Sequence, residues 1–254
     1  MNIIVYSKEE GFEGGVKKLG DESSQCGKTC EIIEIKELPG LLKRGYFETI
    51  QFNIYFLSSD YRISHFIDII KKKNQTVVNE AFLIRGIIVS KFESLERVRR
   101  GGIHIPRQIQ LTYDDNNFLD KLIMPVFIKS KSPRGLVIRV NDKKSLNNRL
   151  ESLPEKQNYY LEENVKNKDN IELKIYYING DAYAQEICGA NTDIPSWFRV
   201  VLDKISKCTE LDVFSADFFI DWGKEEYYCF DINHASSFYK SEKAREVFIS
   251  KILK

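Results

Sequence analysis

The sequence predicts a mixed α/β protein in which a small parallel-sheet α/β domain precedes a larger domain richer in strands. Within the first 90 residues, short apolar runs alternate with helix-like segments, an order typical of a parallel sheet covered by helices. After Pro106 the chain becomes rich in β-type runs, and Asn179-Gly180 separates two of them as a tight hairpin turn. Hydrophobic residues make up 43% of the chain and charged residues 30%, so we expect a folded globular protein.

The N-terminal strands are recognised by their Ile, Val and Tyr content. They are predicted at 3–6, 31–35, 54–57 and 76–79, with helical or polar segments at 11–28, 38–48 and 61–73 between them. The third of these segments has Ile63, Phe66, Ile67 and Ile70 at helical spacing. A further helix is predicted over 81–100, because Gly101-Gly102 is a typical helix stop.

The second part of the chain is predicted to be mostly strands. The predicted runs are 108–112, 126–129, 136–140, 159–162, 173–178 and 182–187, followed by a hairpin of 216–222 and 226–232 and a terminal helix over 241–253. We therefore expect an N-terminal α/β domain at 1–90 and a second domain at 91–254. The second would divide into a smaller lid-like part, 106–165, and a metal-binding part, 166–254.

Charge and composition exclude several partners. The 38 Lys and Arg residues balance the 37 Asp and Glu residues to a net charge of +1, which favours neither nucleic acid nor an anionic membrane as a partner. Five cysteines, an odd number, favour a reducing compartment over a disulfide framework. No signal peptide or apolar stretch of membrane-spanning length is present, so we expect a soluble cytoplasmic protein.

Several common catalytic motifs are missing. The sequence contains no GxGxxG, GxxxxGK[ST], GxSxG or HExxH pattern, and its three histidines are far apart. Dinucleotide turns, P-loops, nucleophile elbows and histidine-based metal clusters are therefore not indicated.

The segment 214–238 is the most informative part of the chain. Asp217 lies inside an otherwise apolar strand, and Asp231 and Asn233 end the next strand on one face, two residues apart. If the two strands pair around Gly223, two carboxylates and an amide can converge, a donor set that suits Mg²⁺. A capped strand end followed by a turn is the alternative interpretation.

Two other strand ends carry charges. Lys129 closes an apolar strand before the loop 130–135, and a lysine directed inward requires an anion such as a triphosphate. Glu162 and Glu163 end another strand. Backbone groups at this strand end could bind the edge of a purine base, and a carboxylate could bind the ribose. The alternative interpretations are that Lys129 simply leaves the sheet at its edge, and that Glu162 and Glu163 form a solvated strand end.

Taken in order, these motifs resemble the ATP-grasp superfamily, in particular the branch of the ribosomal-protein-modifying glutamate ligases. The resemblance spans residues 76–238. Its motifs are Val77-Val78-Asn79, Ser90-Lys91, Gly101-Gly102-Ile103-His104-Ile105-Pro106, 125–129, 161–165, Glu172-Leu173-Lys174 with 177–180, and the set Asp217, Asp231 and Asn233.

The resemblance implies a site for ATP and two Mg²⁺ ions, with Mn²⁺ as the alternative metal. Lys91 and Lys129 would neutralise the phosphates. Glu162, Glu163, Asn164 and Val165 would line the adenosine site, Asp217, Asp231 and Asn233 would hold the metal ions, and Lys174, Asn233 and Arg134 would act in catalysis. Such positioned charges are the main requirement of phosphoryl transfer.

The sequence departs from the family pattern on the acceptor side. The phosphate loop 130–135 has a single glycine, where Arg134 would supply charge in place of backbone N–H groups. The family's D-x-R is Glu172-x-Lys174, and Gln185-Glu186-Ile187 stands where a basic residue is expected. The terminal N-x-x-P-G has become 233–238, Asn-His-Ala-Ser-Ser-Phe.

The predicted function is ATP-dependent ligation of a carboxylate to an amine through an acyl phosphate. The substrates would be a small-molecule or peptide carboxylate and an amine, and association of several copies of the chain stays open. A small-molecule kinase on the same fold and a nucleotide-binding protein with weakened catalysis are the alternatives.

Overall fold

The structure is a computed structural model that describes residues 1–58, 60, 62–73, 75–84, 91–111, 121–132, 135–186, 191–234 and 238–253. The chain divides into two compact units. The first contains Met1–Ile88, Leu173–Asp217 and Ile232–Lys254, and the second contains Val89–Glu172 and Phe218–Asp231. The chain thus enters each unit more than once, whereas the sequence analysis places continuous domains at 1–90 and 91–254. That domain division stays a prediction.

The first unit contains the predicted parallel sheet. Its strands are β1 (Asn2–Tyr6), β2 (Cys30–Glu34), β3 (Asn53–Leu57) and β4 (Thr76–Val77), paired in the order β2-β1-β3-β4. All three pairings are parallel. The alternation of strand and helix in this part of the sequence therefore predicted the sheet correctly.

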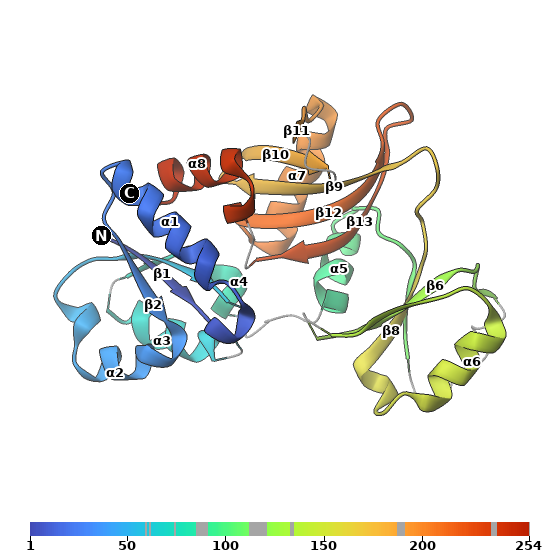
Figure 1. The fold of residues 1–254 in the computed structure, drawn as a ribbon, viewed down its shortest axis with the longest axis horizontal. Helices are drawn as coiled ribbons and strands as arrows, with labels where there is room; N and C mark the ends of the chain where they lie inside the picture. Colours follow the sequence, from blue (N-terminus) through green and yellow to red (C-terminus); the bar gives the residue numbers. More distant parts are fainter. Residues whose placement is uncertain are drawn as a thin grey trace. The chain divides into compact units, whose positions relative to one another are not determined.

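Helices and short 3₁₀ turns connect the strands of the parallel sheet (Figure 1). They are η1 (Lys8–Glu10), α1 (Glu13–Gln25), η2 (Ile35–Glu37), α2 (Leu38–Lys43), η3 (Tyr46–Glu48) and α3 (Ile63–Lys71), and α4 (Glu80–Ile84) follows β4. The C-terminal η6 (Phe238–Lys240) and α8 (Glu242–Lys251) return to this unit. The Ser241 side chain caps α8 by accepting a bond from the Ala244 N–H.

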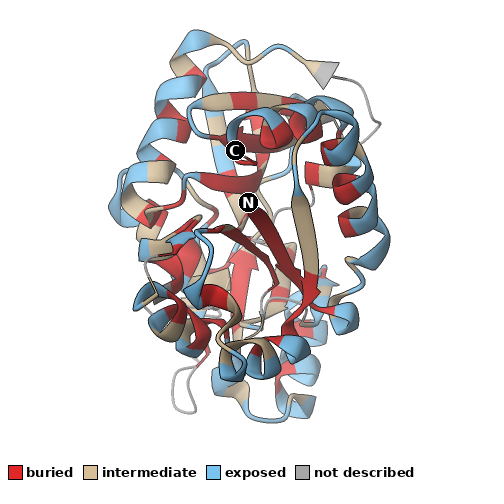
Figure 2. Ribbon diagram, turned by 90° about the vertical axis from the view of Figure 1, so that its left-hand side faces the viewer, coloured by how far each residue is buried: buried red, intermediate tan, exposed pale blue. Residues whose placement is uncertain are grey.

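One face of the parallel sheet is covered by elements from both ends of the chain. Ile4 and Tyr55 from the sheet, Leu19 from α1 and Phe248 from α8 belong to one buried apolar cluster. The two central strands of this sheet, β1 and β3, are almost entirely buried (Figure 2). The core of the first unit is therefore completed by residues that follow the first strand by more than 240 positions.

The second unit contains an antiparallel sheet. Its strands are β5 (Gln108–Gln110), β6 (Val126–Ser130), β7 (Val137–Val140) and β8 (Tyr159–Glu163), in the order β5-β8-β6-β7. The unit also holds α5 (Lys91–Arg100), α6 (Lys143–Ser152) and η5 (Lys156–Asn158). Val126, Ile128 and Leu161 on one face pack with Leu146 and Leu150 of α6. That packing leaves the other face of the sheet for polar and aromatic side chains.

A third sheet has the order β11-β10-β9-β12-β13. Its strands are β9 (Ile171–Ile178), β10 (Asp181–Glu186), β11 (Asn191–Thr192), β12 (Val213–Asp221) and β13 (Glu226–Asn233), and α7 (Ser196–Thr209) precedes β12. The hairpin at Asn179-Gly180 is confirmed, because both residues have positive φ, 47° and 88°.

The structure differs from the sequence analysis in its helices. Within the helix predicted over 81–100, the structure describes α4 and α5, and residues 85–90 between them lie outside the described part. The predicted glycine stop is confirmed, since Gly102 has φ 80° and its N–H bonds the Arg99 carbonyl at 2.9 Å. Helices α6 and α7 were not predicted. Every described helix is too short or too polar to cross a membrane.

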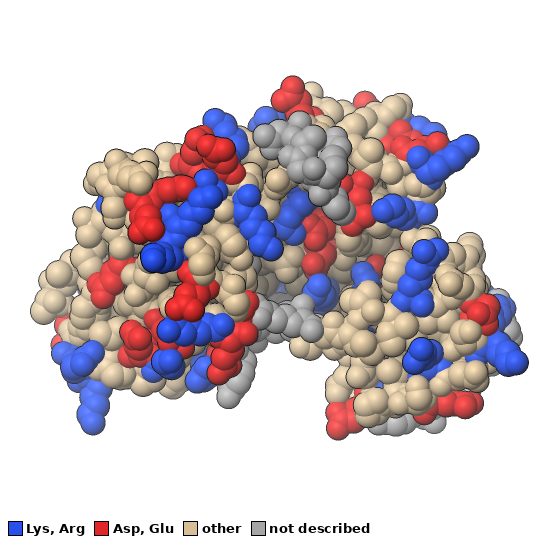
Figure 3. Space-filling view, viewed as in Figure 1, with Lys and Arg blue, Asp and Glu red and all other residues tan. Residues whose placement is uncertain are grey.

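On the face seen in Figure 3, basic and acidic side chains are intermixed. This agrees with the net charge of +1.

Asn79 is a buried polar clamp inside the first unit. Its Nδ2 donates to the Val213 carbonyl at 2.6 Å, and its Oδ1 accepts from the N–H groups of Asp212 and Val213, both at 2.9 Å. The residue is 4% exposed and has φ 60°, a conformation that asparagine tolerates well. These bonds fix the start of β12 beside the end of β4.

We predict that Asn79→Ala lowers the free energy of unfolding by about 3 kcal/mol, because two N–H groups and one carbonyl would lose buried partners. Urea denaturation measures the loss. The matched control is Asn179→Ala, since Asn179 also has positive φ but is exposed. It should cost only about 1 kcal/mol, the strain of a left-handed alanine. Equal losses in the two variants would contradict the clamp.

Candidate functional site

The candidate site begins with the polar face of the sheet in the second unit. Phe127 and Lys129 are two residues apart on β6 and so share a face. Strand register places Glu162 directly opposite Phe127, and Gln108 opposite Glu162 on the other side. Directly opposed residues of an antiparallel pair point the same way. One lysine, one glutamate and one glutamine thus share one face of the sheet across three strands.

These three polar side chains form a buried chain of contacts. The Lys129 ammonium forms an ion pair with Glu162 Oε1, and Gln108 Nε2 donates to Glu162 Oε2 at 2.8 Å. The Glu162 side chain is 3% exposed and that of Lys129 12%. Burial raises the pKa of the Glu162 carboxyl, while Lys129 and Gln108 act in the opposite direction. Both Glu162 oxygens therefore have a donor within the unit.

A cavity of about 520 Å³ lies against this polar face. Its lining consists of Phe127, Lys129, Val137, Arg139, Glu162, Asn164, Lys166, Asn167, Glu172, Phe219 and Phe230. Phe219 and Phe230 stack with ring centroids 4.4 Å apart, and the Lys129 ammonium lies 5.8 Å from the Phe127 and Phe230 centroids. Aromatic walls with a few convergent polar groups suit a flat heterocyclic ligand that carries an anionic tail.

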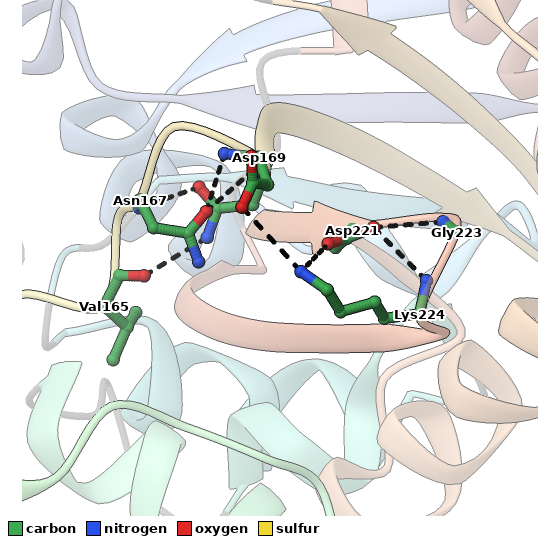
Figure 4. A network of polar contacts seen from close by, with 7 residues as sticks. Val165, Asn167, Asp169, Asp221, Gly223 and Lys224 are labelled. Atoms are coloured by element: carbon green, nitrogen blue, oxygen red, sulfur yellow. Dashed lines mark hydrogen bonds and ion pairs between the residues drawn. The ribbon is translucent and has the colours of Figure 1, made fainter.

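The loop that follows β8 is shaped by its own asparagines. Asn170 Nδ2 donates to the Val165 carbonyl at 3.1 Å, and Asn167 Oδ1 accepts from the Asp169 N–H at 2.8 Å (Figure 4). Asn164, at the start of the loop, donates its N–H to the Pro125 carbonyl at 3.3 Å. In the segment that the resemblance assigns to adenosine, the Asn164 N–H and the Val165 carbonyl are thus already hydrogen-bonded within the second unit.

A lysine bridge connects this loop to the turn between β12 and β13. Lys224 Nζ lies 2.7 Å from Asp221 Oδ2 and 3.8 Å from Asp169 Oδ2 (Figure 4). Asp221 Oδ1 also accepts from the N–H groups of Gly223 and Lys224. Lys224 is half exposed, so the bridge belongs to the surface of the second unit.

Lys91 pairs with a predicted metal ligand. It is the first residue of α5, its N–H bonds the Lys131 carbonyl at 3.1 Å, and its ammonium lies 3.1 Å from Asp231 Oδ2. Both residues belong to the second unit, and their side chains are 26% and 14% exposed.

Lys174 makes the equivalent pair in the first unit. Its ammonium lies 2.7 Å from Asp217 Oδ1, and the two side chains are 27% and 22% exposed. Gln185 stands directly opposite Lys174 on β10. The position where the family pattern expects a further basic residue therefore carries an amide beside the lysine.

The residue after Asn233 anchors the end of β13 in the first unit. His234 is 9% exposed, its Nε2 lies 3.1 Å from the Ser58 carbonyl, and its own carbonyl accepts from the Tyr55 hydroxyl at 3.0 Å. Burial lowers the pKa of His234 to about 4, so the imidazole is neutral at physiological pH.

The structure brings some predicted residues together. Lys129 contacts Glu162, Lys91 contacts Asp231, and Lys174 contacts Asp217. Glu163 lies 3.6 Å from the Arg107 guanidinium, and Arg134 lies outside the described residues. Asp217 and Asn233 belong to the first unit and Asp231 to the second, so their predicted convergence stays a prediction. Among the described residues, no cluster of three or more His, Cys, Asp or Glu side chains forms a metal site.

Several residues of the site were missed by the sequence analysis. Gln108, Phe127 and Phe230 received no role, although polar residues alternate with Ile109 along the short strand β5. A polar residue at the inward position of a strand was the available signal.

Comparison with solved structures shows that the chain has the ATP-grasp fold. It matches D-alanine–D-alanine ligase from Bacillus anthracis, complexed with ATP, with a TM-score of 0.69 and 20% identity, covering 100% of this chain and 94% of that one. It also matches the ATP-grasp ligase PsnB, complexed with a phosphomimetic variant of a minimal precursor, Mg and ADP. The TM-score is 0.69 and the identity 14%, and the match covers 97% of this chain and 93% of that one. A RimK-domain ATP-grasp protein from Sphaerobacter thermophilus matches with a TM-score of 0.73 and 11% identity, covering 100% of this chain and 98% of that one.

A scan of protein-family models and a search of curated proteins found no match to the sequence. The predicted resemblance to the ATP-grasp fold is nevertheless confirmed, because these structural matches extend over almost the whole of both chains.

We predict that Lys129→Met destabilises the protein by about 3 kcal/mol at pH 8, because a buried carboxylate would lose its counter-charge. The folded-state pKa of Glu162 would then lie even further above its ordinary value of 4.5. Since the folded state binds the extra proton, stability should rise as the pH falls from 8 to 5. Urea denaturation between pH 8 and pH 5 measures the free energy of unfolding of the variant and of the wild type.

The double variant Lys129→Met/Glu162→Gln should recover most of the loss and its pH dependence, because no charge stays buried. Lys224→Met, which breaks an exposed pair, should change stability little. A pH-independent loss in the single variant would show that Glu162 is not the group left uncompensated.

Proposed function

We propose that the protein is an ATP-dependent ligase that joins a carboxylate to an amine through an acyl phosphate. The observation that carries the proposal is the aromatic cavity with its buried Lys129–Glu162 pair, on a chain with the ATP-grasp fold. The volume of the cavity suits a nucleoside, and the ammonium beside it suits the first phosphates. The structural neighbours complexed with ATP or ADP support the same nucleotide.

The aspartates fit a divalent metal by their chemistry. Asp217 and Asp231 are half-buried carboxylates, and each already holds one ammonium group as a stand-in cation. In the proposal, Asp217, Asp231 and the amide of Asn233 hold Mg²⁺, for which oxygen donors are preferred. The metal would contribute neutralisation of charge on the β- and γ-phosphates. PsnB in complex with Mg and ADP supports Mg²⁺ as the metal.

In the proposed reaction, an oxygen of the substrate carboxylate attacks the γ-phosphorus, the bond to the β–γ bridging oxygen breaks, and ADP leaves. The amine nitrogen then attacks the acyl carbon, the C–N bond forms, and phosphate leaves with loss of a proton from the amine. Lys91 and Lys129 neutralise phosphate charge, and Lys174 orients the acceptor end beside the γ-phosphate. No protein nucleophile is needed, because positioning supplies most of the acceleration.

The residues proposed to bind the acceptor substrate favour a ligase over a kinase that acts on a polyphosphorylated alcohol. Lys174 faces Gln185 across the strand pair, so this position offers one cation and one amide where the family pattern has two basic residues. A single carboxylate needs less positive charge than a polyphosphorylated alcohol. Among the neighbours, one is a D-alanine–D-alanine ligase and another is complexed with a precursor peptide, so we propose an amino acid or peptide as the carboxylate substrate.

We predict that the Lys129→Met/Glu162→Gln variant binds MgATP at least about 100-fold more weakly than Glu162→Gln alone, since the two differ only in the phosphate-facing cation. Isothermal titration calorimetry measures both affinities. Lys224→Met should bind like the wild type. Equal affinities of the first two variants would show that Lys129 does not meet the nucleotide.

The reaction type is tested by trapping. With ATP, Mg²⁺ and a panel of amino acids and peptides, the ligase should release ADP only when a carboxylate is present. Hydroxylamine should convert the acyl phosphate to a hydroxamate, detected by mass spectrometry. A stable phosphorylated alcohol without hydroxamate would instead identify a kinase on the same fold.

A further inference from the structure

Three lysines predicted to meet ATP or its acceptor are each already paired with a carboxylate. Two of these carboxylates, Asp217 and Asp231, are the proposed metal ligands, and their lysines come from the same unit as the aspartate. The distances are those of direct ion pairs, 2.7 Å for Lys174–Asp217 and 3.1 Å for Lys91–Asp231. Each of the two proposed carboxylate ligands thus has a counter-cation within its own unit.

We propose that Lys91 and Lys174 keep the metal ligands neutralised until nucleotide binds, so that a divalent cation binds productively only together with ATP. This inference rests on the proposed function. In each pair, an aspartate at −1 and a lysine at +1 sum to zero, so a free metal ion gains little electrostatic energy from either aspartate. Without its lysine, each aspartate would present a charge of −1.

The triphosphate provides the competing partner. It carries about four negative charges, so an ammonium group moves from one carboxylate to a stronger anion. A lysine can make this exchange because its charge sits on a flexible four-carbon stem, whereas a guanidinium fork would stay bidentate on the aspartate. Lys91 is fixed by its backbone N–H, which bonds the Lys131 carbonyl, so only its side chain needs to move.

The burial of these pairs fits an exchangeable role. Lys91 and Lys174 are 26% and 27% exposed, so water can solvate them during the exchange. Lys129 is only 12% exposed and its partner Glu162 3%, which makes that pair a fixed part of the cavity. Metal and nucleotide would consequently strengthen each other's binding by the same factor, as linkage requires.

The test is Mn²⁺ binding without nucleotide, followed by electron paramagnetic resonance. We expect Lys91→Met and Lys174→Met each to bind Mn²⁺ at least about tenfold more tightly than the wild type, the effect of removing one nearby unit charge. Lys91→Arg and Lys174→Arg, which keep the charge, should behave like the wild type. Lys224→Met is the matched control, because it breaks a 2.7 Å lysine–aspartate pair outside the proposed site.

The wild type should also bind Mn²⁺ at least about tenfold more tightly when a non-hydrolysable ATP analogue is present. Unchanged Mn²⁺ affinity in both methionine variants, or an equal gain in Lys224→Met, would overturn the inference. A gain in one methionine variant alone would overturn the role of the other lysine. Failure of the wild type to bind the analogue would refute the nucleotide site, and the metal titrations would still decide the role of the lysines.

Discussion

The second unit depends on the cost of burying Glu162. A carboxylate with 3% exposure is tolerated only while donors occupy its oxygens, and the strand register supplies both of them, Lys129 from β6 and Gln108 from β5. The other face of the same sheet is apolar and packs on α6. This division requires every one of the four strands to keep its register, because a slip of one residue would move the charges into the core. The cation at the cavity is therefore fixed by folding.

The proposed function requires an almost neutral protein to bind a highly charged nucleotide. With 38 basic and 37 acidic residues, attraction over long distances is small. In the proposed function, local attraction comes instead from three lysines, each paired with a carboxylate of its own unit. Lys129 is less exposed than Lys91 and Lys174, which is why we propose a structural role for its pair and an exchangeable role for the other two.

Much of the backbone could be predicted from the sequence, because apolar runs and turn residues act locally. The parallel strands and the Asn179-Gly180 hairpin are examples. Helix α6 was missed because its sequence is mostly polar, with Leu146 and Leu150 as its buried residues. Helix α7 was missed although it buries five side chains, since adjacent Val200 and Val201 obscure a helical period.

The sequence singled out many residues of the candidate site, but it did not predict which residues they contact. The family resemblance singled out Lys91 and Asp231, but their contact joins residues 140 positions apart and depends on where α5 begins. Gln108 carries no motif, and its importance follows only from lying opposite Glu162 in the sheet. Pairing across strands is a property of register, which a single sequence does not specify.

The way the chain returns to the first unit has a consequence during synthesis. The buried ring of Tyr55 in β3 packs at a tilt against Phe238 and edge-to-face against Phe248, with ring centroids 5.6 and 5.0 Å apart. A ribosome that adds about 5–20 residues per second makes Phe248 roughly 10–40 s after Tyr55. During that interval one apolar face of the N-terminal sheet lacks α8, its covering helix. The nascent chain therefore presents a surface that chaperones recognise until the last helix emerges.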